Sequence, residues 1–238
     1  MAMRKSMQPS RDGLVVRTHP RSPAAEAFRM IRTNLEFLGA NGRSRVWLLT
    51  SPGAREGKST VAANLALTVA ATGRRTLLVD ADLRRPVQHR LFQLDNRRGL
   101  SSVLTGAAGW RDCLQPVGSD DGEGASHLDV LTSGPLPPNP AELLQLQEWK
   151  GFLAEVREAY PIVFIDAPPV LFVTDAQVMA TDVDRVLLIA RSGYTRKDAL
   201  SEACRALDRS GVKNLAVVLN RVSQNDTYGY YAYYERRE

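Results

Sequence analysis

The sequence predicts an α/β protein with a doubly wound, mainly parallel sheet that helices cover. Short aliphatic runs recur along the chain, and they are near-continuous rather than alternating, which is typical of strands buried on both faces. Helical segments separate these runs, and such strand–helix alternation favours a doubly wound arrangement. With 238 residues, 44% of them hydrophobic and 24% charged, the chain has the size and composition of a single globular domain with a buried core.

The elements are expected in a regular order along the chain. Residues 1–22 are polar, so an extended N-terminal arm is expected there. The first helix is expected over residues 23–38, because Ser22 can cap it, Pro23 suits its first position and Gly39 ends it. Strands are expected at residues 45–50, 76–80, 128–132, 162–166, 185–190 and 215–219, with longer helices at 58–72, 141–160 and 196–210.

The composition indicates a cellular compartment, but it does not select one class of binding partner. The net charge of +5 suits acidic partners such as nucleotides, anionic lipids or nucleic acid, and it also suits a surface that is basic for solubility. Cys113 and Cys204 lack the spacing of metal ligands and are expected as free thiols of a reducing compartment. No apolar run approaches the length of about 20 residues that a membrane span needs, and no signal peptide is recognised. A cytoplasmic chain is therefore expected, with any membrane contact made through a partner.

A phosphate-binding loop is predicted between the first strand and the helix that follows it. The segment SPGAREGKST, residues 51–60, has the strand before it and the helix after it that such a loop requires, although Pro52 stands where the strict pattern has glycine. Backbone N–H groups can wrap the phosphates, Lys58 can place its ammonium between the outer ones, and the Ser59 hydroxyl can bind Mg²⁺. The alternative is a chance GKST at a helix start. The expected nucleotide-binding residues of the loop are Gly53, Ala54, Arg55, Glu56, Gly57, Lys58, Ser59 and Thr60.

Three aspartates at the ends of buried strands extend the prediction from a phosphate-binding loop to an Mg-ATP site. Asp80 and Asp82 lie at the end of the strand at residues 76–80, and Asp166 ends the strand at 162–166. Ligands of open α/β sheets gather at the carboxyl ends of the strands, so these side chains are expected beside the loop. Asp82 is expected to bind Mg²⁺, Asp166 fits a Walker B acid that supports the metal, and Asp80 is the candidate base for an attacking hydroxyl. Each aspartate alone could instead be a helix cap or a loop residue.

At these residues the sequence resembles the bacterial tyrosine kinase (BY-kinase) family, which is linked to capsular and exopolysaccharide synthesis. GKST around Lys58, LLVDADLRRP up to Pro86 and VFIDAPP around Asp166 are similar to the three nucleotide motifs of that family. The resemblance runs from about Pro20 to the C-terminus. It implies a P-loop NTPase fold with deviant Walker motifs, ATP and Mg²⁺ as cofactors, and a protein-tyrosine kinase activity.

The resemblance also assigns roles and exposes departures from the family pattern. It implies Lys58, Asp80 and Asp82 as catalytic residues. Min and Par partition ATPases share the loop but usually carry an early lysine, where this chain has Gly53. Family loops commonly read PGPGEGKST, whereas Arg55 here replaces a glycine at a position where side-chain space is expected to be tight. The Arg55 side chain could add a phosphate contact or point to solvent.

Two further segments fit the resemblance. Glu26, Arg29 and Arg32 recur at every third position of the first helix, and a similar pattern in the family mediates contacts between subunits of a ring; local ion pairs on a solvated face are the alternative. Asn220 is a candidate adenine contact by analogy with related ATPases. The tail at residues 222–238 holds five of the seven tyrosines and resembles the autophosphorylated cluster of the family; a docking peptide is the alternative. The predicted autophosphorylation sites are Tyr228, Tyr230, Tyr231, Tyr233 and Tyr234.

The predicted organisation is an arm at residues 1–22, a kinase domain at 23–221 and a flexible tyrosine-rich tail at 222–238. The resemblance implies a kinase that regulates capsule or exopolysaccharide synthesis and export. Its expected partners are further copies of itself in a ring, a membrane-embedded polysaccharide co-polymerase that activates it at the inner face of the membrane, and a tyrosine phosphatase. Nucleic acid is not expected, since the chain lacks a recognisable binding module. The alternative is a non-catalytic or weakly hydrolysing ATP-switch subunit related to the partition ATPases.

Overall fold

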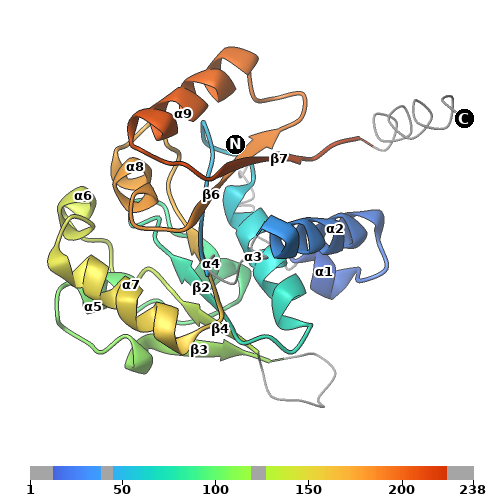
Figure 1. Cartoon of the computed structure of the whole chain (residues 1–238). Coiled ribbons are helices and arrows are strands. Elements are labelled where there is room, and N and C mark those ends of the chain that lie inside the picture. Colours follow the sequence, from blue (N-terminus) through green and yellow to red (C-terminus); the bar gives the residue numbers. More distant parts are fainter. Residues whose placement is uncertain (1–12, 39–44, 119–126, 224–238) are drawn as a thin grey trace, which may run out of the picture.

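A computed structural model describes residues 13–38, 45–118 and 127–223 of the chain. Within these ranges one sheet of seven strands has the order β3-β4-β2-β5-β1-β6-β7 (Figure 1). All neighbouring strands pair in parallel except β3 and β4, which pair antiparallel. The strands are β1 (Val46–Thr50), β2 (Thr76–Asp80), β3 (Leu114–Val117), β4 (Leu128–Leu131), β5 (Ile162–Asp166), β6 (Arg185–Arg191) and β7 (Leu215–Asn220).

The central strands β2, β5 and β1 are buried along their whole length. Their sequences TLLVD, IVFID and VWLLT put apolar side chains on both faces, and each ends in a polar residue. In the register of the sheet, Asp166 pairs with Asp80 on one side and with Leu49 on the other. Parallel pairing therefore brings the carboxyl ends of these strands together. The mainly parallel, doubly wound fold expected from the sequence is confirmed.

Helices cover both faces of the sheet (Figure 1). One face packs against α3, with α2, α4 and Leu14, the residue before α1, contributing to the same buried cluster, and the other packs against α5, α7, α8 and α9. The helices are α1 (Val15–Thr18), α2 (Pro23–Leu38), α3 (Lys58–Ala70), α4 (Gln88–Leu91), α5 (Leu100–Leu104), α6 (Pro140–Leu143), α7 (Gln147–Ala159), α8 (Asp175–Ala180) and α9 (Lys197–Arg209), with a 3-10 turn at Arg111–Cys113.

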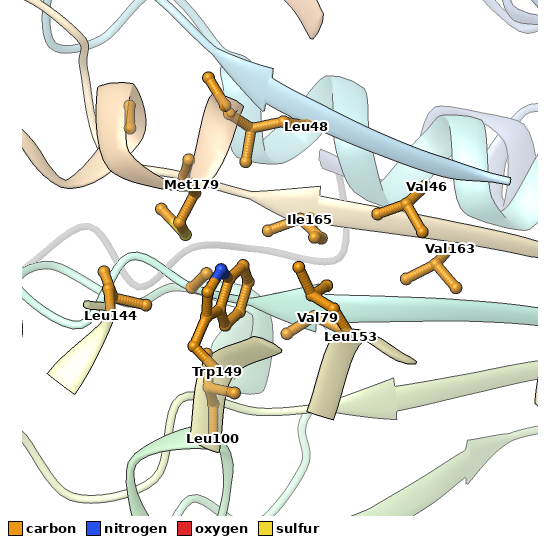
Figure 2. Close-up of a cluster of buried hydrophobic side chains, with 14 of the residues drawn as sticks. Val46, Leu48, Val79, Leu100, Leu144, Trp149, Leu153, Val163, Ile165 and Met179 are labelled. Carbon is orange, nitrogen blue, oxygen red and sulfur yellow. The ribbon is translucent and has the colours of Figure 1, made fainter. Parts of the chain in front are cut away.

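The core beneath α7 and α8 is centred on Trp149 (Figure 2). Trp149 is fully buried, and it belongs to the same cluster as Met179 of α8 and Ile165 of β5. Its indole Nε1 donates a hydrogen bond to the Asp182 carboxylate at 3.2 Å, so the polar end of the ring is satisfied. This packing holds β5 from one side and thereby fixes the position of Asp166 at the end of the strand.

The helix expected over residues 141–160 is divided in two, which corrects the sequence prediction. The helix α6 ends at Leu143, and α7 begins at Gln147. Leu144 lies between them and is buried in the core cluster, next to Trp149 and Met179 in Figure 2. Tertiary packing of Leu144 therefore takes precedence over the helical propensity of a segment that contains no proline or glycine at the break.

The described part of the expected N-terminal arm is also not extended. It contains α1, and two hydrogen bonds tie this segment to α3. The backbone N–H of Val16 donates to Asn64 Oδ1 at 3.1 Å, and Asn64 Nδ2 donates to the carbonyl of Gly13 at 2.7 Å. Asn64 is fully buried, so a side chain distant in the sequence shapes this turn.

The strand β3 was not expected, because its sequence LQPV contains no aliphatic run. It lies at the edge of the sheet, which is where a proline such as Pro116 is tolerated in a strand. Two predictions lie outside the described residues in large part: the first part of the arm and the tyrosine-rich tail. None of the helices in the described part of the chain is both long and apolar enough to cross a membrane.

Candidate active site

The predicted phosphate loop connects β1 to α3, and its last glycine is required by the backbone. Gly57 precedes α3 with φ of 92°, in the left-handed region that favours glycine. A Cβ atom at this position would lie 2.3 Å from Nδ2 of Asn220. The loop therefore closes against the end of β7, and the eight residues expected to bind nucleotide form this loop and the first turn of α3.

Arg55 adopts a left-handed backbone conformation, with φ of 64°. Its side chain is exposed, so the tight side-chain space expected from the sequence is not found. A glycine at this position, as in the family loops, would instead relieve the backbone strain that a non-glycine residue carries at positive φ. The carbonyl oxygen of Arg55 accepts a hydrogen bond from Arg191 Nη1 at 3.4 Å, which links the loop to the end of β6.

Glu56 ties the loop to the connection between β6 and α9 through its side chain and to the end of β7 through its backbone. Its buried carboxylate accepts hydrogen bonds from the Gly53 N–H at 2.9 Å and from the Thr195 hydroxyl at 2.6 Å. Its carbonyl oxygen accepts a hydrogen bond from Asn220 Nδ2 at 2.9 Å. Thr195 was not singled out in the sequence, since a threonine in a connecting loop carries no signal. The Asn220 amide thus contacts the loop itself, and its contact with adenine stays a prediction.

The aspartates expected to bind metal converge on the lysine of the loop. Nζ of Lys58 lies 2.8 Å from Asp82 Oδ2 and 3.2 Å from Asp166 Oδ1. It also lies 3.2 Å from the hydroxyl oxygen of Ser59. All three charged side chains are nearly or completely buried. Burial acts to lower the pKa of Lys58, but the attraction of Asp166 and Asp82 outweighs it, so the pKa is raised and the lysine stays charged.

Asp80 is buried next to this cluster, and backbone groups hold its carboxylate. Oδ2 accepts hydrogen bonds from the N–H groups of Val87 at 3.0 Å and Gln88 at 2.9 Å, while Oδ1 lies 3.3 Å from the N–H of Asp82. Burial and then the charge of Asp166 raise the pKa of Asp80 to about 7. A carboxyl group with such a pKa is suited to exchange protons near neutral pH, although its role as the base stays a prediction.

The segment after Asp82 reaches back into the cluster through Gln88, a residue without any signal in the sequence. Nε2 of Gln88 donates hydrogen bonds to Asp166 Oδ2 at 2.8 Å and to the carbonyl oxygen of Ser59 at 3.1 Å. In the same segment, the guanidinium of Arg84 binds the buried carboxylate of Asp175 through two hydrogen bonds of 2.9 Å. The segment between β2 and α4 is therefore anchored at Arg84 and at the first residue of α4.

The remaining predicted residues lie apart from this cluster or outside the described ranges. On α2, Glu26 and Arg29 form an exposed ion pair of 2.7 Å, and Arg29 Nη2 donates to the carbonyl of Pro20 at 2.6 Å. Arg32 is partly buried. These local contacts match the solvated-face alternative, and contacts between subunits stay a prediction. The five tail tyrosines belong to the residues that the structure does not describe.

Comparison with known proteins identifies the family of the chain. Residues 47–237 match the family model of the CobQ/CobB/MinD/ParA nucleotide binding domain. Tyrosine-protein kinase YwqD of Bacillus subtilis is 40% identical over 234 residues, which cover 97% of this chain and 96% of that protein. The putative tyrosine-protein kinase CapB of Staphylococcus aureus is 36% identical over 221 residues, covering 93% and 94%.

A solved structure also resembles this chain. The kinase domain of Escherichia coli tyrosine kinase ETK superposes with a TM-score of 0.84 at 32% sequence identity, covering 94% of this chain and 84% of that one. These relatives favour a tyrosine kinase over a non-catalytic ATP-switch subunit. The chain thus belongs to the bacterial tyrosine kinase family, built on the CobQ/CobB/MinD/ParA nucleotide-binding fold.

Proposed function

We propose that this protein-tyrosine kinase binds Mg-ATP at the Lys58 cluster and phosphorylates the tyrosines of its own tail, thereby regulating capsule or exopolysaccharide synthesis and export. The observation that carries the proposal is the convergence of Lys58, Asp82 and Asp166 at the ends of adjacent strands. A cationic side chain that can bind phosphate and two carboxylates that can bind a metal, all at the mouth of a phosphate loop, are the parts that phosphoryl transfer requires.

The side chains present fit a magnesium ion. Mg²⁺ in nucleotide sites is held by one or two carboxylates, together with hydroxyl, water and phosphate oxygens. Asp82, Asp166 and the Ser59 hydroxyl supply such oxygens beside the loop. In the described ranges no group of three or more His, Cys, Asp or Glu side chains is placed to hold a metal by itself, and phosphate and water oxygens would supply the remaining ligands. This donor set favours magnesium that arrives with the nucleotide.

Each residue of the cluster has a separate role in the transfer. Lys58 exchanges its carboxylate contacts for the outer phosphates, and the loop N–H groups hold their oxygens. Bound magnesium neutralises phosphate charge. The tyrosine oxygen forms a bond to the γ-phosphorus, the bond to the bridging oxygen of ADP breaks, and Asp80 takes the hydroxyl proton. A tyrosine hydroxyl has a pKa of about 10 in solution, so a nearby base with a pKa of about 7 helps this step.

The proposed assembly is a ring in which the tail of one subunit enters the site of another. Glu26, Arg29 and Arg32 are the proposed subunit contacts, supported by the family resemblance. The proposed partners are a membrane-embedded co-polymerase that recruits and activates the kinase at the inner face of the membrane, and a tyrosine phosphatase. Five phosphates would add about −7.5 to −10 charges to a chain of net charge +5. Phosphorylation is therefore expected to loosen the ring, which size measurements before and after incubation with ATP can test.

Phosphate mapping tests the proposed activity. Purified protein is incubated with ATP and Mg²⁺, with and without a candidate membrane activator, and modified residues are located by mass spectrometry. We expect phosphate on the tail tyrosines of the wild type and of the control Lys150→Met, which changes an exposed lysine of α7, but not on Lys58→Met. ATP turnover without phosphotyrosine would contradict the proposal.

A further inference from the structure

Gln88, the first residue of α4, touches two residues of the proposed magnesium site and the proposed base. Its Nε2 donates to Asp166 Oδ2 at 2.8 Å and to the Ser59 carbonyl at 3.1 Å, and its backbone N–H donates to Asp80 Oδ2 at 2.9 Å. Its exposed fraction is 0%. Through one amide group, Gln88 therefore links the end of β5 to the start of α3, which carry the proposed metal ligands Asp166 and Ser59.

The hydrogen-bond partners fix the orientation of the Gln88 amide. Both partners of the side chain, the carboxylate of Asp166 and the carbonyl of Ser59, are acceptors. They require the NH₂ group, so the amide cannot be rotated by 180° without losing both bonds. Its Oε1 is buried and has no hydrogen-bond partner within the ranges that the structure describes. A buried acceptor without a donor is costly, and it indicates a donor that belongs to the working site.

We propose that Gln88 is a positioning residue of the magnesium site, an inference that rests on the proposed Mg-ATP function. Its NH₂ group holds one oxygen of Asp166 and thereby sets the direction of the other, which contacts Lys58. Its Oε1 accepts a hydrogen bond from a water molecule in the metal's shell. Magnesium keeps several waters when it binds with phosphates, and such waters donate both hydrogens because their oxygen faces the metal. A buried acceptor beside Asp166 and Ser59 suits that role.

The substitution Gln88→Met tests this inference, because methionine keeps the length and unbranched shape of glutamine but removes the donor and the acceptor. The dissociation constant of ADP is measured by calorimetry in excess Mg²⁺ and again in EDTA. Loss of such a contact around a metal ligand lowers affinity by about 10- to 100-fold. We expect Gln88→Met to weaken ADP binding about tenfold in Mg²⁺ and to leave it within about twofold in EDTA.

A matched control separates this effect from a general loss of buried polar contacts. Thr68→Val removes a hydrogen bond of 2.7 Å from Thr68 to the Asn64 carbonyl, near the far end of α3. For Thr68→Val, the ratio of the ADP affinity in Mg²⁺ to that in EDTA should equal the ratio in the wild type. If Gln88→Met does not fold, Gln88→Asn, which is one methylene too short to hold both acceptors, should show the same selective loss.

Three outcomes would overturn the inference. Unchanged ADP affinity in both Mg²⁺ and EDTA in a folded Gln88 variant means that Gln88 does not serve the metal. An equal loss of affinity in Mg²⁺ and in EDTA means that Gln88 supports the loop in a purely structural way. A wild-type protein whose ADP affinity is independent of Mg²⁺ removes the proposed magnesium site itself, and this result differs from the first two because it is seen without any substitution.

Discussion

Replacing Lys58 with methionine should destabilise the folded protein as well as abolish transfer. Lys58 is the cation in contact with both Asp82 and Asp166, and the exposed fractions of the three side chains are 11%, 5% and 0%. Removing one partner of a buried ion pair leaves an uncompensated buried charge and costs about 3–5 kcal/mol. For a domain of this size, that corresponds to a fall in melting temperature of about 6–20 °C. A protein that carries Lys58→Met must therefore be shown to be folded before its inactivity is interpreted.

Urea unfolding at neutral pH measures this cost. The wild type, Lys58→Met and Lys150→Met are compared without nucleotide, and the exposed control should lie within about 0.5 kcal/mol of the wild type. The deficit of Lys58→Met should shrink in millimolar Mg²⁺, because the metal can replace the ammonium between Asp82 and Asp166, and it should also shrink at lower pH as carboxylates are protonated. If Lys58→Met is as stable as the wild type at neutral pH, the cluster is not held by Lys58 and our reasoning fails.

Three further predictions concern the loop and Asp80. Gly57→Ala should cost about 2–3 kcal/mol of folding stability, from strain at positive φ and from displacing the Asn220 amide. The control Gly73→Ala, also at positive φ but with open space around it, should cost less. Equal costs in chemical unfolding would contradict the close approach of Gly57 to Asn220. Burial raises the pKa of Asp80 to about 7, so the folded state holds a proton there that the unfolded state releases. Between pH 5 and pH 8 the free energy of unfolding of the wild type should therefore fall by about 2–3 kcal/mol more than that of Asp80→Asn. Parallel pH profiles of the two proteins would refute this. Thr195→Val removes a 2.6 Å hydrogen bond to the loop carboxylate and should weaken ADP binding severalfold with unchanged Mg²⁺ dependence, and unaltered calorimetric affinity would count against this support of the loop.

The sheet and the convergence of its aspartates could be predicted from the sequence. Aliphatic runs that end in aspartate identify the buried strands, and parallel pairing leaves little choice about where Asp80 and Asp166 meet. GKST between a strand and a helix places Lys58 at the same end of the sheet. These inferences succeed because the pattern, the topology and the motif all constrain the same few positions.

The parts that could not be predicted depend on contacts between distant residues. Gln88 opens a helix of only four residues, which has too few turns for hydrophobic periodicity, and the backbone contacts to Asp80 fix its place. The break at Leu144 arises from packing beneath α7 rather than from a helix-breaking residue. Arg55 could be identified as a departure from the family, but its exposed side chain and positive φ follow from the path of the loop.

Quantitative mass spectrometry of tail phosphotyrosine is the most direct test of the central claim. Wild type, Asp82→Asn and the exposed control Asp198→Asn are incubated with ATP in Mg²⁺ and in EDTA, at concentrations that allow self-association. We predict phosphate on the tail of the wild type and the control in Mg²⁺, and a decrease of about 100-fold or more in Asp82→Asn or in EDTA, because a charge that stabilises the transfer is then missing. Tail phosphorylation that is equal in Asp82→Asn and the wild type would contradict the assignment of this cluster as the site of phosphoryl transfer.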